Sequence, residues 1–163
     1  MAEVEDIMRR TLEDCVYDIR RRHVEAGQRV TGRTMDALEA RVRREGTAII
    51  GEIWGLPYTG AWETGSRPAR RRGGDEERRA MIRHLREWAD IRGLTAGMTD
   101  SQAQHLASYL AWYIKRYGSR LYREGGRRDI ITPAVEAAKA TLAERLGAFY
   151  DTEINNMFFN GTD

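Results

Sequence analysis

The sequence has very little cysteine and lysine for a chain of 163 residues. Cys15 is the only cysteine, so the chain cannot form an internal disulfide. Lysine occurs only at Lys115 and Lys139, and all the other basic residues are arginine. Because a guanidinium forms paired hydrogen bonds with carboxylates and phosphates, an arginine-rich surface suits interfaces. A GC-rich genome is the alternative explanation of this arginine excess.

Long hydrophobic segments are also missing. No apolar run reaches the ~18 residues that a membrane-spanning helix needs. The acidic N-terminus, Met1–Asp6, lacks the apolar region of a signal peptide, so we expect the chain to fold in a cytoplasm without a membrane. The composition, 41% hydrophobic and 32% charged, excludes a disordered chain. The net charge of only +2 restricts nucleic-acid binding to local basic clusters.

The common catalytic and cofactor motifs are absent. The sequence has no G-x-G-x-x-G after a predicted strand, no phosphate-binding P-loop and no G-x-S-x-G. His23, His84 and His105 do not have the i, i+4 spacing of a helical metal pair, and we expect them to be solvated or to cap a helix and not to bind a metal. Glu63 and Asp129 would support acid–base chemistry only if the fold brought them together. We therefore expect no enzyme activity, no metal and no cofactor.

Hydrophobic periodicity predicts an α+β fold in a single domain, residues 1–163. Apolar residues at spacings of three and four predict helices, and an alternating pattern around Glu45-Gly46 predicts an antiparallel β-hairpin. The predicted elements are a helix at 3–26, the hairpin at about 38–54, and helices at 76–92, 101–124 and 133–158. We expect the small sheet to pack against the helices, with the two C-terminal helices as the main packing pair.

Local signals mark two helix starts. Thr99-Asp100-Ser101 offers N-cap residues for one helix. Thr132 followed by Pro133 predicts the start of the last helix, because proline suits the first helical position. Six apolar residues at helical spacing form the predicted core: Trp88, Leu110, Tyr113, Leu142, Leu146 and Phe149.

The segment 66–79 is predicted to be an arginine-rich loop. Residues 67–79 contain six arginines, a proline and two adjacent glycines, and they include the acidic run Asp75–Glu77. Such a segment cannot bury enough apolar surface to offset the entropy of ordering it. We predict that Arg67, Arg70, Arg71 and Arg72 contact carboxylates of a neighbouring protein or DNA phosphates. The alternative is a plain solvated connector.

Five aromatic residues have the spacing of a helix face: Tyr109, Trp112, Tyr113, Tyr117 and Tyr122. They suggest either a stacking platform for single-stranded nucleic acid or a core and subunit interface. Helical spacing favours the second interpretation, and Trp112 lies off the main apolar stripe, which favours an interface. Glu63, Arg127 and Arg128 are further candidates for an interface or a DNA channel.

Several short motifs follow one another between residues 28 and 150. They are Thr31-Gly32-Arg33, the hairpin, Pro57-Tyr58-x-x-x-Trp62-Glu63-x-Gly65-Ser66-x-Pro68, the basic loop, Leu85-x-x-Trp88-Ala89, Arg92-Gly93-Leu94, Ala111-x-x-Ile114, Tyr122-Arg123-x-Gly125-Gly126 and Asp129-Ile130-x-Thr132-Pro133-Ala134. In this order they resemble the neck or tail-completion family of minor virion proteins of long-tailed double-stranded DNA bacteriophages. Thr59 and Gly60 depart from that family's usual alanine after the tyrosine.

The resemblance implies a non-catalytic α/β protein that forms a sixfold or twelvefold ring at the head–tail junction of the virion. Such a ring is assembled in the host bacterial cytoplasm. Its partners would be identical copies, a head-connector protein and a tail-tube or terminator protein, and double-stranded DNA would pass through its lumen. The alternative is a DNA-binding module in which the arginine-rich loop and the helix around Arg116, Arg120 and Arg123 contact phosphates. A small nuclease is disfavoured by the missing metal-binding cluster.

Overall fold

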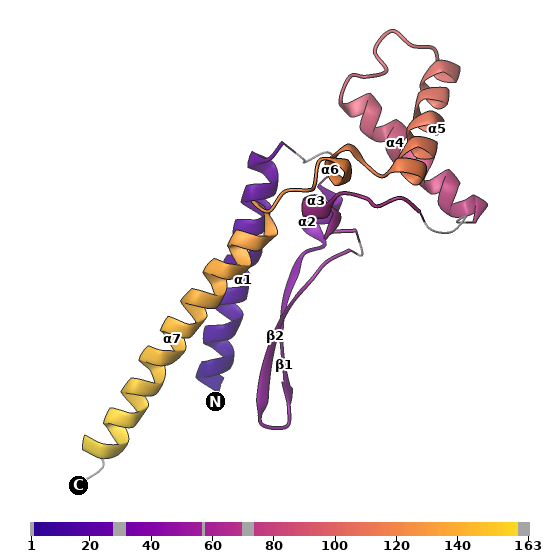
Figure 1. Ribbon diagram of the computed structural model, residues 1–163. Helices are drawn as coiled ribbons and strands as arrows, with labels where there is room; N and C mark the ends of the chain where they lie inside the picture. The colour runs from indigo at the N-terminus through magenta and orange to yellow at the C-terminus, as the bar shows by residue number, and fades with distance from the viewer. Residues whose placement is uncertain (1, 28–31, 57, 70–73, 160–163) are drawn as a thin grey trace. The chain divides into compact units, whose positions relative to one another are not determined.

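The computed structural model describes residues 2–27, 32–56, 58–69 and 74–159, and it has an α+β fold (Figure 1). Its elements are α1 (Ala2–Glu25), α2 (Arg33–Asp36), β1 (Glu39–Glu45), β2 (Ala48–Trp54), α3 (Ala61–Thr64), α4 (Asp75–Ile91), α5 (Asp100–Tyr117), α6 (Arg120–Arg123) and α7 (Ile131–Phe159). They form two compact units: the first is Met1–Thr59 with Arg128–Asp163, and the second is Gly60–Arg127. Each unit is described separately.

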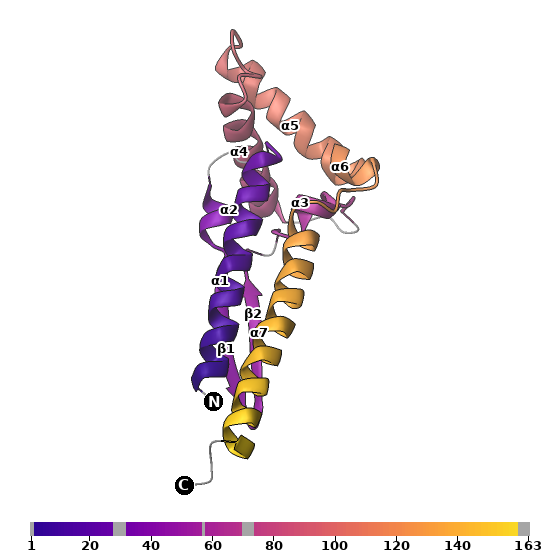
Figure 2. The same cartoon turned by 90° about the vertical axis from the view of Figure 1, so that its left-hand side faces the viewer.

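The first unit is built on α1 and α7, which run side by side in opposite directions (Figures 1 and 2). One face of α1 is buried, and it includes Cys15 and Ile19. Arg145 of α7 donates a hydrogen bond to Thr11 Oγ1 at 3.0 Å, which joins the two helices at mid-length. His23 lies on the same buried face of α1, so the expectation that it is solvated is wrong.

The predicted hairpin is confirmed, and it lies against α1. β1 and β2 pair antiparallel, with Arg41 opposite Glu52 and Val42 opposite Gly51. Because side chains alternate between the faces of a strand, one hairpin face carries mainly small and apolar residues and the other carries most of the charged ones. A Cβ on Gly51 would lie 2.7 Å from Leu12 Cδ1, so this glycine lets the hairpin approach the helix closely.

The second unit has a core of small residues between α4 and α5. Ile82 of α4 packs with Ala107 and Ala111 of α5, and the partly buried Met81 and Leu85 lie against them. Alanine lets the two helix axes come close together. The buried stripe of α5 is thus formed by alanines at i, i+4 spacing and not by the larger apolar residues expected from the sequence.

Two sequence-based expectations about packing are wrong. The structure pairs α5 with α4 within the second unit and α7 with α1 within the first, so each of the two long C-terminal helices has another helix as its main partner. The predicted core residues are only half-buried in this structure; they are Trp88, Leu110, Tyr113, Leu142, Leu146 and Phe149. These residues do lie on helices, as their spacing predicted. Their large side chains lie at the edges of the cores, and smaller residues fill the centres.

Three helix boundaries deserve comparison with the predicted ones: the end of α5 and the starts of α4 and α7. The predicted helix at 101–124 ends at Tyr117, because Gly118 adopts φ 82° and ψ 168°, and Ser119 then caps the short α6. α4 begins at Asp75, so the last residues of the predicted loop are helical. α7 begins at Ile131, two residues before the predicted start. The other predicted bounds agree to within a residue.

Candidate interaction surface

A hydrogen-bonded junction joins the segment after α3 to the end of α5 and to α6, all within the second unit. Ser119 N donates to Ser66 O at 2.8 Å, and Ser66 N donates to Ser119 Oγ at 2.9 Å. Ala69 N donates to Lys115 O at 2.8 Å. The same Ser119 hydroxyl caps α6 by accepting from Tyr122 N. Residues 65–69 therefore lie along the C-terminal end of α5 and are fixed there by their backbone.

Glycines make this junction possible. Gly65 has φ 68° and ψ 174°, and a Cβ at this position would collide with the Tyr122 backbone and with Ser119 Oγ. Gly126 has φ 78°, and a Cβ there would lie 2.7 Å from Glu63 O. Gly65 and Gly126 of the motifs are thus required by close backbone approach.

Glu63 and Arg127 are brought together at the same junction. Glu63 is buried, and its carbonyl oxygen accepts a hydrogen bond from Arg127 N at 2.8 Å. Arg127 is half-buried. Both residues were predicted to be interface or DNA-channel candidates. In the structure their backbones stabilise the junction, and the Glu63 side chain is not exposed for contact with a partner.

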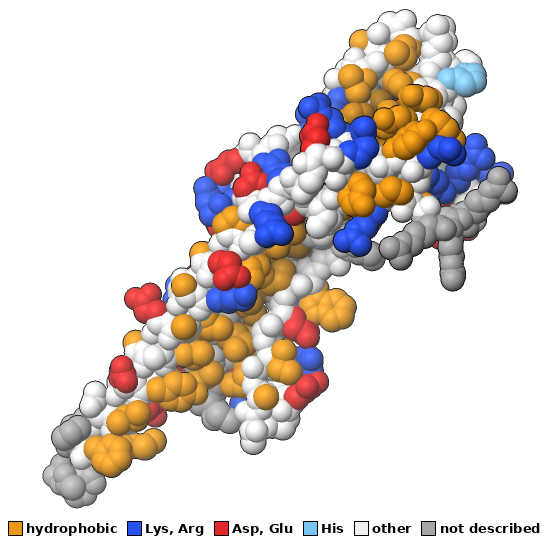
Figure 3. Space-filling model, viewed as in Figure 1, with side chains coloured by type: hydrophobic (Ala, Val, Ile, Leu, Met, Phe, Trp, Pro, Cys, Tyr) orange, Lys and Arg blue, Asp and Glu red, His pale blue; other side chains and the backbone are white. Residues whose placement is uncertain are grey.

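α5 and the following α6 carry a largely exposed cluster of aromatic rings and guanidinium groups. We call it the aromatic–arginine face, and its members are Tyr109, Trp112, Tyr113, Arg116, Tyr117 and Arg123. Tyr109 and Trp112 are 56% and 52% exposed, with ring centroids 5.9 Å apart. Figure 3 shows hydrophobic side chains with Lys and Arg side chains beside them on this part of the second unit. Trp112, predicted to be an interface residue, lies within this cluster.

The guanidinium groups of the aromatic–arginine face stack on its rings. Arg123 lies 5.0 Å from the Tyr113 ring centroid, and Arg116 lies 5.7 Å from that of Tyr117. Neither arginine has a carboxylate partner among the described residues. Cation–π contacts order these side chains while their N–H groups remain able to bind a further acceptor. The face therefore offers flat apolar surface and positive charge together.

The remaining predicted site residues lie in different parts of the chain, and some of them lie outside the described residues. Arg67 is exposed on the segment 65–69. Arg128 is exposed and belongs to the first unit. Arg70, Arg71 and Arg72 lie outside the described residues, so the prediction that they contact a partner stays a prediction.

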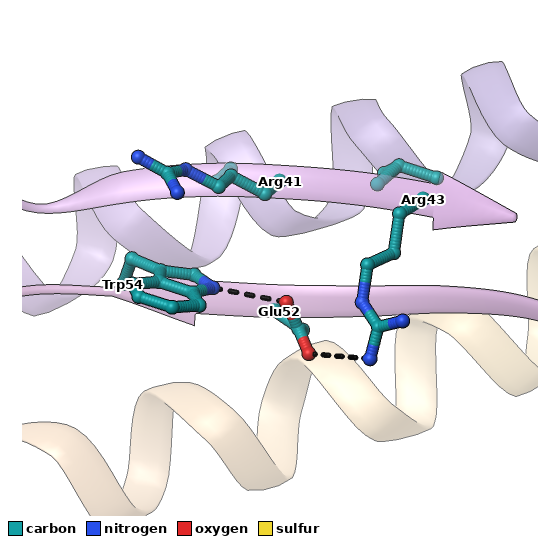
Figure 4. A pocket seen from close by; sticks show the side chains of 6 residues that line it. Arg41, Arg43, Glu52 and Trp54 are labelled. Atoms are coloured by element: carbon teal, nitrogen blue, oxygen red, sulfur yellow. Dashed lines mark hydrogen bonds and ion pairs between the residues drawn. The ribbon is translucent and has the colours of Figure 1, made fainter.

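The outer face of the hairpin holds a shallow hollow (Figure 4). Trp54 Nε1 donates to Glu52 at 2.9 Å, Arg43 donates to Glu52 at 3.1 Å, and the Arg41 guanidinium lies 4.8 Å from the Trp54 ring centroid. The hydrogen bond from Trp54 and the contact with Arg43 lower the pKa of the Glu52 carboxyl. Because the polar and charged groups of the hollow already form hydrogen bonds and ion pairs with one another, the hollow does not resemble a ligand site.

Sequence reasoning missed the exposed end of α7. Near the end of this helix Met157 is exposed, as are Tyr150 and Ile154. The signal was present in the sequence: apolar residues lie all around this helix instead of on one stripe. A helix that is apolar on two sides needs a second covering element.

Neither a metal centre nor a membrane span is evident. Within residues 2–27, 32–56, 58–69 and 74–159, no three His, Cys, Asp or Glu side chains group as metal ligands. Burial raises the pKa of the Cys15 thiol, and the nearby Asp18 charge adds to this effect, so the protonated form is favoured. No helix of the described chain has the length and apolarity needed to cross a membrane.

Comparison with known proteins gives no relative. No protein-family model, no curated protein and no solved structure matches the chain.

Proposed function

We propose that this chain is a non-enzymatic structural protein of the head–tail neck of a tailed bacteriophage, in which copies of it form a ring around the DNA passage. The order of motifs between residues 28 and 150 suggests the family. The observation that carries the assembly role is the exposed aromatic–arginine face on α5 and α6. Tyr, Trp and Arg are the residues enriched at the energetic centres of protein interfaces.

The motif residues themselves support a structural role. Gly65, Ser66 and Gly126 act through backbone hydrogen bonds and close approach at the junction, and Glu63 contributes its carbonyl oxygen. Nothing in this arrangement requires a reactive side chain. An assembly protein needs a contact surface whose shape is fixed by the structure beneath it. The motif residues build a hydrogen-bonded junction beside the exposed face and so support this role.

Deletion of the gene from the phage or prophage that carries it tests the proposal. We expect DNA-filled heads and separate tails to accumulate, and a plasmid copy of the gene to restore joined virions. Electron microscopy of the lysate counts the three kinds of particle. Joined virions in the deletion strain at the normal ratio would exclude a neck function.

Cryo-electron microscopy of the joined virion tests the ring. We expect sixfold or twelvefold density of this chain between head and tail, because an interface between two different faces closes into a ring when its rotation allows. A single copy without symmetric neighbours would contradict this part of the proposal.

A DNA-binding module is the second candidate, and one observation favours it. Residues 101–123 contain Lys115, Arg116, Arg120 and Arg123 but no Asp or Glu. A protein that binds through phosphates loses affinity steeply with salt, in proportion to the number of contacts. Binding of the isolated chain to duplex DNA should therefore be measured between about 50 and 200 mM salt. A steep slope that disappears in Arg116→Ala/Arg123→Ala would favour this candidate over the structural one.

A further inference from the structure

The C-terminal half of α7 has an apolar side that is exposed in the structure. Gly147, Tyr150, Ile154 and Met157 alternate at spacings of three and four, so they form one stripe, which we call the α7 seam. Tyr150, Ile154 and Met157 are 52%, 50% and 71% exposed. Figure 3 shows hydrophobic side chains gathered on this part of α7. Seven-residue spacing of this kind is typical of a helix that packs against another element.

The surroundings of the α7 seam are acidic. Between Leu146 and Phe158 the only charged residues are Asp151 and Glu153. Neither carboxylate has an ion-pair partner in the part of the chain that the structure describes. If the seam packed on the seam of a second α7 in parallel, these carboxylates would repel one another, so a partner with positive charge is favoured.

The aromatic–arginine face has the matching properties. It is apolar at its centre, and its charged residues are Arg116 and Arg123, with no acidic residue between 101 and 123. The lengths also agree. Tyr150 to Met157 spans about 10.5 Å of helix, and Tyr109 to Tyr117 spans about 12 Å. The chain thus carries two surfaces of similar length and opposite charge.

We propose that the α7 seam of one copy packs on the aromatic–arginine face of a second copy, with Asp151 and Glu153 paired to Arg116 and Arg123. The contact joins two different faces of the same chain, so each copy uses one face on each neighbour. Such a heterologous contact propagates from copy to copy and gives a ring when it closes. This inference deepens the proposed ring, because it names the surfaces that join its subunits.

Charge reversal tests the pairing. One variant carries Arg116→Glu and Arg123→Glu, and the other carries Asp151→Arg and Glu153→Arg. Each variant alone should self-associate about tenfold more weakly or worse than the wild type, because like charges then meet across the contact. An equal mixture should recover most of the wild-type association, since every favourable contact then joins one variant to the other. A chain with all four substitutions should also recover.

Sedimentation equilibrium measures the dissociation constants at low salt up to the solubility limit, and circular dichroism checks that each variant keeps its helices. A matched control reverses two exposed arginines that lie elsewhere, Arg10→Glu and Arg83→Glu, and should associate like the wild type. The chosen substitutions lie on the surface, so the variants should fold.

Several outcomes would overturn the inference. A wild-type chain that stays monomeric up to its solubility limit would do so, and so would variants that associate as the wild type does. If Asp151→Arg/Glu153→Arg pairs with the wild type while the arginine variant behaves normally, two α7 helices pack on each other instead. If arginine reversal abolishes duplex DNA binding without changing association, the face binds phosphates. The proposed neck function is tested separately by the gene deletion, and it survives if a different contact forms the ring.

Discussion

Gly65 shows how a single residue fixes the junction of the second unit. Its φ of 68° and ψ of 174° fall in a region that is open essentially to glycine alone, and a Cβ would lie 2.6 Å from Ser119 Oγ. Gly65→Ala should therefore lower the free energy of unfolding by about 1–3 kcal/mol through backbone strain, with a further loss as α6 is displaced. Urea denaturation measures the change.

Gly60→Ala is the matched control for that substitution. Gly60 has φ −60°, and nothing lies within 4 Å of its would-be Cβ. Gly60→Ala should cause no comparable loss and should raise the free energy of unfolding by about 0.4–1 kcal/mol, because alanine adopts the helical dihedrals of Gly60 without strain and has less freedom in the unfolded chain. Equal losses in the two variants would mean that close approach at Gly65 is unimportant.

At the scale of the element, the start of α5 rests on a reciprocal cap. Thr99 Oγ1 accepts from Gln102 N, and Gln102 Oε1 accepts from Thr99 N at 2.8 Å. Thr99→Ala should lower the free energy of unfolding by about 1 kcal/mol, because the backbone N–H of Gln102 loses its acceptor, the Thr99 hydroxyl. Thermal and urea unfolding measure the effect. Ser101→Ala, an exposed neighbour in the first turn, should change stability by less than about 0.5 kcal/mol, and an equal loss there would contradict the capping role.

The hairpin should make stability depend on pH through Glu52. Trp54 and Arg43 stabilise its charged form and lower the pKa of the carboxyl in the folded chain. The unfolded state therefore binds more protons in the acid range, so the contribution is present above the ordinary pKa and is lost as the pH falls through the lowered one. The stability difference between the wild type and Glu52→Gln should shrink between about pH 6 and pH 3.

A second carboxylate provides the control for this pH dependence. Glu76 is exposed on the first turn of α4 and has no ion pair among the described residues. Glu76→Gln shows how much of any change comes only from removing one exposed carboxylate. If Glu52→Gln differs from the wild type by the same amount at every pH, the contacts of Glu52 do not depend on its charge.

Local signals account for the elements that the sequence predicted correctly. The hairpin follows from alternation around Glu45-Gly46, and the start of α5 follows from Thr99. The break after Tyr117 was missed because Gly118 lies inside an apolar pattern that continues to Leu121. Its positive φ of 82° goes with a tertiary contact, the hydrogen bond from Ser119 N to Ser66 O, which no local pattern reveals. Aromatic spacing indicated the surface around Trp112, whereas the buried backbone role of Glu63 depends on Arg127, 64 positions away in the sequence, and no local pattern reveals it.

At the scale of the whole molecule, hydrophobic periodicity could not predict which helices pair. The apolar stripe of a helix shows which side is buried, but it does not show which other helix covers it. α1 and α7 stand at opposite ends of the sequence and form the first unit, whereas α4 and α5 are neighbours and form the core of the second. The expected pairing of the two C-terminal helices assumed that their large side chains form the core. In the second unit the buried side of α5 is formed by alanines instead, and the aromatic residues of α5 are half-buried or exposed.

The two units should respond separately to the loss of a core side chain. Ile19 is 2% exposed in the first unit, and Ile82 packs between α4 and α5 in the second. Each change to alanine should cost about 2–5 kcal/mol within its own unit, with the smaller loss at Ile82, where the surrounding core is small. Hydrogen exchange followed by mass spectrometry reports this for each helix. Ile82→Ala should accelerate exchange in α4 and α5 more than in α1 and α7, and Ile19→Ala should do the reverse. Equal acceleration of all four helices by either substitution would mean that the chain unfolds as one cooperative whole despite its two cores.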